Sequence, residues 1–201
     1  MTEPSSYQSV GSTSSSLLDR VKANDQDAWR WLVKLYSPLV LFWCRRAGVR
    51  PDDRRDTFQE VFRAVAAHVG QFHRDQPGDS FRAWLRTITT NKVNDYFRRR
   101  SRQPDALGGS TAQRRLSEVP ESEVLSVDDG TAATEEALLM RQALALIRPE
   151  FEERTWAAFW QTMFGGQSSS VAAEALGMTA AAVRQAKSRV MRRLREELGG
   201  G

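Results

Sequence analysis

The sequence has very little cysteine and no long apolar run. Its single cysteine, Cys44, excludes an internal disulfide and favours a reducing, cytoplasmic compartment. The longest apolar run, Leu39 to Cys44, is far too short to cross a bilayer, and the N-terminus lacks the pattern of a secretory signal. No stretch alternates apolar and polar residues for long enough to predict a strand. These absences favour a soluble, all-α protein without membrane insertion.

Residues suited to catalysis or metal binding are also scarce. His68 and His73 lie five residues apart, off one helical face and without a cysteine partner, so we expect no zinc site and no cofactor. Three acids, Asp52, Asp53 and Asp56, gather at one helix start among arginines, which suits docking better than metal-assisted phosphoryl transfer. The sequence therefore does not favour an enzyme such as a recombinase.

Basic residues are clustered rather than merely abundant. The 201-residue chain carries a formal net charge of only +4, yet its sequence pI is about 9.6. Clustering matters more than the total charge for binding a polyanion. The length suits one or two small domains.

The stretch from Ser168 to Leu194 has the pattern of a helix-turn-helix motif. Gly177 stands where a helix C-terminus needs a left-handed residue, and Thr179 offers a hydroxyl oxygen to cap the next helix. In that second helix an apolar stripe recurs at offsets of three and four, formed by Val183, Ala186, Val190 and Leu194. We expect the first helix to pack through Val171, Ala172, Ala175 and Leu176. The second helix of such a motif lies in the major groove of DNA.

A helical hairpin with a solvated basic face is the alternative interpretation of this stretch. Against it, Arg184 to Arg195 contains six lysines or arginines and no acid. A merely solvated helix usually mixes both signs of charge, so the pattern favours DNA binding.

A second basic helix is predicted from Phe81 to Ser101. From Arg82 to Arg102 there are seven lysines or arginines against one acid, Asp95. Amides and aromatic side chains interleave with them, a composition typical of surfaces that bind nucleic-acid backbones and unstacked bases. Trp84 and Tyr96 are equally consistent with ordinary core aromatics.

The most regular amphipathic helix is predicted from Asp52 to Phe72. Its apolar positions recur at offsets of three, four and seven, and acids lie on the outward side near its start. Acids at a helix N-terminus complement the helix dipole, which accounts for Asp53 and Asp56. Gln59, Glu60 and Arg63 are left as a docking face.

Composition divides the chain into four parts. Residues 1–15 are rich in Ser and Thr and are expected to form a disordered tail. Residues 16–102 form one predicted helical domain, in which Pro38 is expected to kink or break a helix. Residues 103–134, where acids outnumber bases, are a predicted flexible linker, and residues 135–198 are a second helical domain. In the second domain Trp156, Phe159, Trp160 and Met163 are candidates for the core.

Two basic helical domains joined by an acidic linker resemble a bacterial RNA polymerase sigma factor of the extracytoplasmic-function (ECF) group. The resemblance covers about residues 16 to 198. The stretch DDRRDTFQEVFRAVAAHVGQF is similar to the family's polymerase-docking helix, and FRAWLRTITTNKVNDYFRRR is similar to its promoter-melting segment. These two matches precede the helix-turn-helix in the family's order.

The resemblance implies roles for three sets of residues. The residues that would dock on the polymerase β′ clamp helices are Asp53, Asp56, Gln59, Glu60 and Arg63. Those that would hold the unpaired strand of the −10 element are Asp79, Ser80, Arg86, Asn91, Lys92 and Arg98. Those that would contact the −35 element as duplex are Thr179, Arg184, Gln185, Ser188 and Arg189.

The resemblance also implies partners. These are core RNA polymerase, through its β′ clamp helices and β subunit, and promoter DNA in double- and single-stranded form, and an anti-sigma factor is a further hypothesis. The acidic linker would suit a path through the positively charged RNA channel of the polymerase. The rival interpretation is a helix-turn-helix transcription regulator that acts without being a polymerase subunit. That rival leaves the second basic helix without a role.

Overall fold

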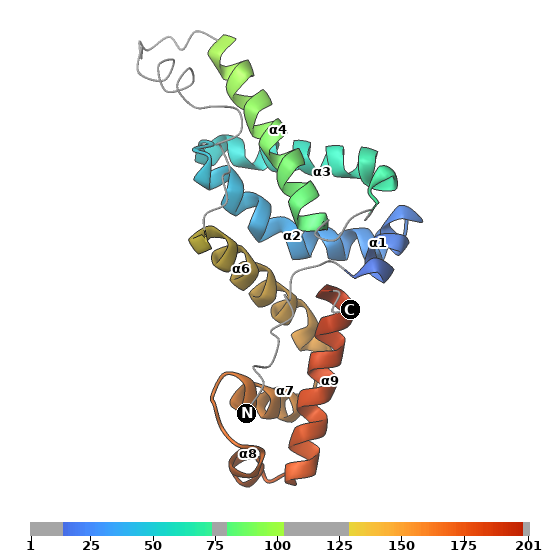
Figure 1. Ribbon diagram of the computed structural model, residues 1–201, viewed down its shortest axis with the longest axis vertical. Helices are drawn as coiled ribbons and strands as arrows, with labels where there is room; N and C mark the ends of the chain where they lie inside the picture. The colour runs from blue at the N-terminus through green and yellow to red at the C-terminus, as the bar shows by residue number, and fades with distance from the viewer. Residues whose placement is uncertain (1–13, 74–79, 103–128, 199–201) are drawn as a thin grey trace, which may run out of the picture. The chain divides into compact units, whose positions relative to one another are not determined.

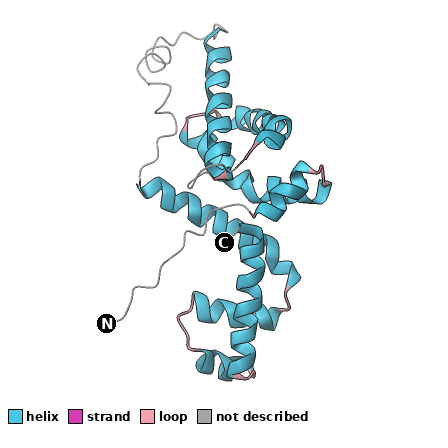
Figure 2. Cartoon of the chain, turned by 45° about the vertical axis from the view of Figure 1, so that its right-hand side comes forward, coloured by secondary structure: helices cyan, strands magenta, loops and turns pink. Residues whose placement is uncertain are grey.

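The computed structural model describes residues 14–73, 80–102 and 129–198, and every regular element in these ranges is helical. They form eight α-helices and three short 3-10 helices, and no strand occurs among them (Figure 2). The all-α fold predicted from the sequence is therefore confirmed. The chain divides into two compact units, one of residues Asp19–Leu139 and the other of Met140–Gly201 with Met1–Leu18.

In the first unit, α4 lies across α2 and α3 (Figure 1). Its helices are α1 (Ser15–Lys22, which begins before the unit boundary), α2 (Gln26–Arg46), α3 (Arg54–His68), α4 (Phe81–Arg102) and the first part of α6 (Asp129–Ile147). The 3-10 turns Pro51–Asp53 and Val69–Gln71 flank α3, so the single helix predicted from Asp52 to Phe72 is shorter at both ends.

The core of the first unit forms where these helices meet. Tyr36 of α2 and Phe81 of α4 are fully buried and pack edge to face, with ring centroids 5.1 Å apart. Val61 and Val65 supply the buried side of α3. The predicted apolar spacing thus fixes which face of each helix turns inward.

Of the kink or break expected at Pro38, the break does not occur, because α2 continues to Arg46. One expectation about a helix boundary is wrong. The helix expected to start at Glu135 starts at Asp129, so the last six residues of the predicted linker are helical. The rest of that linker, and all but the end of the predicted tail, lie outside the described residues.

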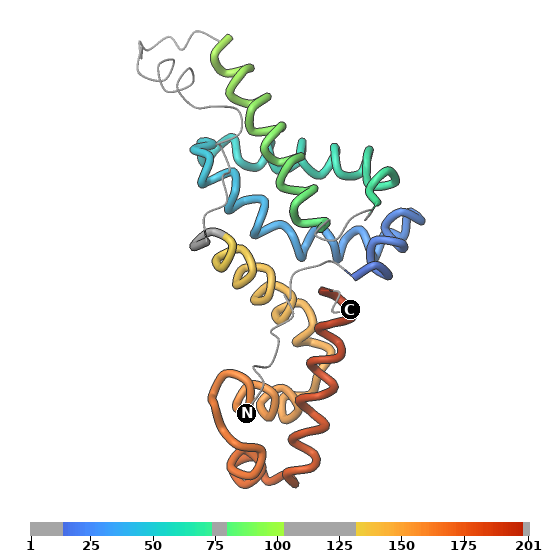
Figure 3. The backbone as a smooth tube through the Cα atoms, in the orientation of Figure 1, coloured from blue at the N-terminus to red at the C-terminus, as the bar shows by residue number. Residues whose placement is uncertain are grey.

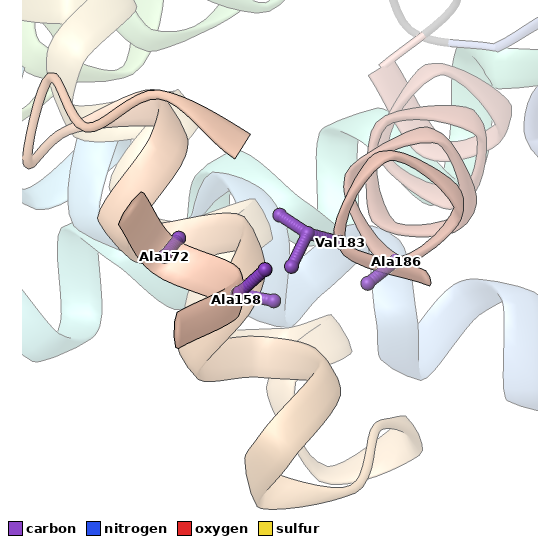
Figure 4. Close-up of a cluster of buried hydrophobic side chains, with 5 residues drawn as sticks. Ala158, Ala172, Val183 and Ala186 are labelled. Carbon is purple, nitrogen blue, oxygen red and sulfur yellow. The ribbon is translucent and has the colours of Figure 1, made fainter. Parts of the chain in front are cut away.

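The second unit contains the remainder of α6, then α7 (Glu153–Met163), α8 (Ser169–Leu176) and α9 (Ala180–Leu198). Small side chains meet at its centre, where Ala158, Ala172, Val183 and Ala186 form a buried cluster (Figure 4). Alanine at these positions lets the three helices approach closely. Ala173 is also buried.

The exposed faces of α7 and α8 differ from the expectation. Val171 and Ala175 are exposed, whereas Ala172 and Leu176 pack inward as expected, together with Ala173. Trp160 and Met163, two expected core residues, are 47% and 37% exposed. Trp160 instead stacks at the surface on Phe164, with ring centroids 4.5 Å apart.

Candidate nucleic-acid and polymerase interfaces

The turn between α8 and α9 has the local geometry that its sequence predicts (Figure 3). Gly177 ends α8 in the left-handed conformation at φ 58°, and Ser168 caps the start of the same helix. The hydroxyl oxygen of Thr179 accepts a hydrogen bond from the backbone N–H of Ala182 at 3.1 Å. Thr179 is thus the cap of the second helix, as predicted.

An arginine that the sequence did not single out holds this turn in place. Arg154 of α7 donates from Nε to the carbonyl of Leu176 at 2.9 Å and from Nη2 to the carbonyl of Gly177 at 3.1 Å. The orphan carbonyls at the C-terminus of α8 are thereby satisfied by a cation, which also complements the helix dipole. Nothing in the local sequence links Arg154 to a turn more than twenty residues later.

The outer face of α9 carries the predicted duplex-binding residues. The apolar stripe of Val183, Ala186, Val190 and Leu194 is buried. The remaining predicted contacts are all exposed and follow one another along the helix: Arg184, Gln185, Ser188 and Arg189. Arginine and glutamine at such positions can form paired hydrogen bonds with base edges in the major groove.

Arg193 of α9 is partly buried and bound to two acids. It donates from Nε and Nη2 to the two carboxylate oxygens of Glu150, at 2.6 and 2.9 Å, and from Nη1 to Glu197. Burial alone would lower the pKa of Arg193, but the hydrogen bonds with Glu150 and Glu197 outweigh it and raise the pKa. The charge of Arg193 is therefore balanced by acids within the second unit.

Helix α4 presents an outer face that carries several of the predicted strand-binding residues. The hydroxyl of Ser80 caps α4 by accepting from the N–H of Ala83 at 3.1 Å, and Asp79 lies outside the described residues. Asn91 and Arg98 are exposed, and their seven-residue spacing places them within about 20° of each other around the helix. Lys92 and Arg98 both pair with Asp95, at 3.6 and 2.5 Å.

Trp84 lies at the start of α4 and is half-buried. Its ring packs on Phe72 and Phe81, with centroid distances of 5.2 and 5.4 Å. The structure therefore places Trp84 at the edge of the core, where part of its surface still reaches solvent.

Arg86 does not share the face of Asn91. Five residues separate them, which corresponds to about 140° around the helix. The Arg86 side chain is 16% exposed and pairs through Nη2 with the carboxylate of Glu135 in α6. Its guanidinium also lies 5.4 Å from the ring centroid of Trp43. The pKa of Arg86 is lowered, chiefly by burial and further by repulsion from Arg82 and Arg46. The structure thus separates Arg86 from the other predicted strand-binding residues.

The predicted docking residues gather along one polar cleft of about 600 Å³ between α3 and the C-terminal part of α4. Its lining comprises Arg50, Asp53, Asp56, Thr57, Gln59, Glu60, Arg63, Tyr96, Arg99 and Arg100. Asp56 and Gln59 are exposed, and Arg63 donates to Glu60 at 2.6 Å and to Gln59 at 3.3 Å. All five predicted docking residues are therefore brought together.

Asp53 differs from the other four because it has internal partners. Its Oδ2 accepts a hydrogen bond from the hydroxyl of Tyr96 at 2.8 Å and lies 3.9 Å from Nη1 of Arg100. Arg100 also donates to the Tyr96 hydroxyl at 3.2 Å. Asp53 thereby joins the start of α3 to the end of α4.

Other chemistry is sparse in the part of the chain that the structure describes. Cys44 is fully buried, and burial raises the pKa of its thiol to about 11, so the reactive thiolate is disfavoured. Within residues 14–73, 80–102 and 129–198, no three His, Cys, Asp or Glu side chains gather as metal ligands. None of the helices in these ranges is both long and apolar enough to span a membrane.

The fold and these surfaces define an all-helical nucleic-acid-binding protein. It has a helix-turn-helix in one unit, and a basic helix beside the polar cleft in the other. Residues 32–103 match the sigma-70 region 2 family, a range that contains the cleft and α4.

Curated relatives extend the match over most of the chain. The RNA polymerase sigma-E factor of Streptomyces avermitilis is 30% identical over 168 residues, 83% of this chain and 82% of that protein. The ECF RNA polymerase sigma factor SigD of Mycobacterium tuberculosis is 28% identical over 186 residues, 88% of this chain and 79% of that protein. The match to the probable sigma factor RfaY of Xanthomonas campestris, at 29% identity over 148 residues, covers 71% of this chain but only 33% of that longer protein.

The chain belongs to the ECF group of RNA polymerase sigma factors. It is thus a transcription initiation factor that directs RNA polymerase to promoters, and its partners are core RNA polymerase and promoter DNA. A solved structure of CnrH in complex with the cytosolic domain of CnrY aligns over 89% of this chain and 92% of that chain, at 24% identity and a TM-score of 0.37.

Proposed function

We propose that three surfaces of this sigma factor divide the work of initiation. The cleft between α3 and α4 docks on the β′ clamp helices, the outer face of α4 holds the opened strand of the −10 element, and α9 reads the −35 element as duplex. The observation that carries this proposal is that α4 and α9 each present exposed arginines on an outer face, while the three acids expected to dock, Asp53, Asp56 and Glu60, line one cleft beside α3.

The acids of α3 in this cleft are the groups that would meet a basic partner. Asp56 and Glu60 lie one helical turn apart at the rim of the cleft, and Gln59 adds an amide beside them. Carboxylates and an amide in this arrangement can pair with arginines or lysines of a helical partner. Asp53 contributes chiefly by fixing α3 against α4, since its carboxylate already accepts from Tyr96.

Strand opening follows from differential affinity. A surface that binds only the unpaired strand shifts the duplex equilibrium toward the open form by the free energy of that binding. On α4, Arg98 can neutralise phosphate, and the exposed amide of Asn91 can donate to and accept from a base edge. Ser80 and Lys92 flank these two residues, and Asp79 precedes Ser80 outside the described residues.

Duplex recognition is assigned to the N-terminal half of α9. The first turns of a recognition helix contact base edges, and here they present Arg184, Gln185 and Ser188 to solvent. The hydroxyl oxygen of Thr179 already caps α9 by accepting from the backbone N–H of Ala182. Thr179 can therefore contact a phosphate or a base by donating its O–H hydrogen.

Three further assignments are part of this proposal. Because it acts together with core polymerase, the protein would be located in the cytoplasm. The acidic linker would run through the RNA channel of the polymerase, and an anti-sigma factor would control access to the docking cleft.

Run-off transcription with core polymerase and a promoter library tests the proposal. The double variant Asp56→Lys and Glu60→Lys should lower affinity for core polymerase at least about tenfold, because like charges then face each other. Glu196→Lys, an exposed charge reversal near the end of α9, is the matched control and should leave that affinity unchanged. No run-off product from any library member, or equal core affinity of both variants, would contradict the docking assignment.

A further inference from the structure

The carboxylate of Glu135 lies in the first unit, on the first half of α6, and has two donors. The indole Nε1 of Trp43 donates to its Oε1 at 2.7 Å, and Nη2 of Arg86 donates to the same oxygen. The Glu135 side chain is only 2% exposed. A carboxylate this buried is stable only because both donors face it.

A second acid of α6 meets the neighbouring arginine of α4. Glu136 Oε1 lies 3.7 Å from Nη1 of Arg82, one helical turn before Arg86. Two consecutive acids of α6 thus oppose two consecutive arginines of the α4 helix face. The pairing resembles the way that successive phosphates of a strand would meet the same guanidinium groups.

The two arginines retain unused hydrogen-bonding capacity. Nε of Arg86 and Nη1 of Arg82 are buried, and neither has a hydrogen-bond partner within the described ranges. A phosphate presents more acceptor oxygens than the single carboxylate oxygen that Arg86 uses here. Exchange of the carboxylate for a phosphate would therefore satisfy donors that α6 leaves without a hydrogen bond.

The energetics allow this exchange. A buried ion pair contributes little net stability, because the cost of removing both charges from water nearly offsets their attraction. When α6 moves away, Glu135 regains water and Arg86 gains either water or phosphate. The contact can therefore hold α6 in the free chain and still be displaced by a polyanion.

We infer that Glu135, supported by Glu136, occupies a phosphate site formed by Arg82, Arg86 and Trp43, and that the first half of α6 competes with the unpaired DNA strand for this site. The inference rests on the proposed function, in which α4 binds the opened strand. It explains why Arg86, expected among the strand-binding residues, is turned away from solvent in the free chain. Strand binding then requires release of α6 from α4.

Affinity for single-stranded DNA provides the first test. The probe is a labelled, mixed-sequence single-stranded oligonucleotide, and its binding to the full chain is followed by fluorescence anisotropy at fixed salt. Glu135→Gln keeps the shape of the side chain and removes its charge, so it should bind the probe about fivefold to tenfold more tightly than the wild type. Glu136→Gln should give a smaller gain of about twofold, since Glu136 is farther from its arginine.

Glu153→Gln is the matched control for the change in net charge. Glu153 is an exposed acid of α7 that pairs with Arg148, and its removal should leave affinity for the probe unchanged. A gain as large as that of Glu135→Gln would show a general charge effect and would overturn the inference. Equal or weaker binding by Glu135→Gln would overturn it as well.

The indole N–H of Trp43 provides a second test, which needs no variant at Glu135 or Glu136. The chain has six tryptophans, so the indole N–H resonance of Trp43 can be assigned by its loss in Trp43→Phe. Saturating oligonucleotide should move this resonance in the wild-type chain, because release of α6 breaks the hydrogen bond from the Trp43 indole to Glu135. A resonance that stays in place at saturation would contradict displacement of α6, even if a variant at Glu135 failed to fold.

Failure of this competition between α6 and the strand and failure of the proposed function give different results. If Glu135→Gln and wild type bind the oligonucleotide equally while the chain still supports run-off transcription with core polymerase, the inferred competition alone is wrong. If run-off transcription fails, the proposed function is wrong whatever the oligonucleotide does.

Discussion

The hydroxyl of Tyr96 donates a hydrogen bond to the carboxylate of Asp53, 2.8 Å away, and so connects two helices to which we assign different tasks. Asp53 precedes α3, which carries the proposed docking residues, and Tyr96 lies on α4, which carries the proposed strand-binding face. Arg100 lies close to both groups. The relative position of the two surfaces within this unit thus depends on one small polar network.

Tyr96→Phe should destabilise the first unit by about 1 kcal/mol, since it removes one hydrogen bond from a half-buried site. Urea unfolding should show a lower midpoint with an unchanged slope. A double-mutant cycle with Asp53→Ala measures the coupling. Additive losses would show that the hydrogen bond contributes nothing.

Asn91→Ala and Arg184→Ala should impair different steps at a promoter selected by run-off transcription. Asn91→Ala should reduce strand opening, measured by permanganate reactivity of unpaired thymines, and leave duplex binding nearly intact. Arg184→Ala should weaken duplex binding by about 1–3 kcal/mol, the usual value of a bidentate base contact. Arg195→Ala, an exposed change at the far end of the same helix, should cost much less. Equal losses of both steps in the Asn91 and Arg184 variants would contradict the assignment.

Gly177→Ala should destabilise the second unit by about 1 kcal/mol or more, because a Cβ is strained at the positive φ of this turn. The added Cβ would also lie 3.1 Å from Nη2 of Arg154, which satisfies the end of α8. Gly70→Ala is the control, since its Cβ meets nothing within 4 Å and its φ is not positive. Thermal melts of both variants should differ, and equal melting temperatures would be inconsistent with this turn geometry.

Asp25→Ala should destabilise α2 at neutral pH but not in acid. Asp25 caps α2, and hydrogen bonds from the backbone of Ala28 and from Arg20 lower its pKa below 3.8. A lowered pKa in the folded state means that the contribution is present above about pH 4 and is lost as pH falls through the folded value. The difference in unfolding free energy between wild type and variant should therefore shrink in strong acid. Asp27→Ala, which removes the neighbouring carboxylate but not the cap, should show a smaller loss at neutral pH.

Local chemistry made much of this protein predictable from its sequence. The helix-turn-helix follows from residues close together in the chain, namely the left-handed Gly177, the cap Thr179 and an apolar stripe at helical spacing. The docking face of α3 and the basic face of α4 follow from the same periodicity. Boundaries were less accurate, because Pro38 stays within α2 and α6 begins six residues early.

The tertiary structure alone decided which charged side chains are paired within the protein and which remain available to a partner. Arg86 pairs with Glu135 49 residues away, Arg193 with Glu150 43 residues away, and Tyr96 with Asp53 43 residues away. Helical spacing shows which side chains share a face, but it carries no information on which distant acid packs against that face. Sequence therefore determined the helices and their charged surfaces, whereas packing determined which cations remain available to DNA.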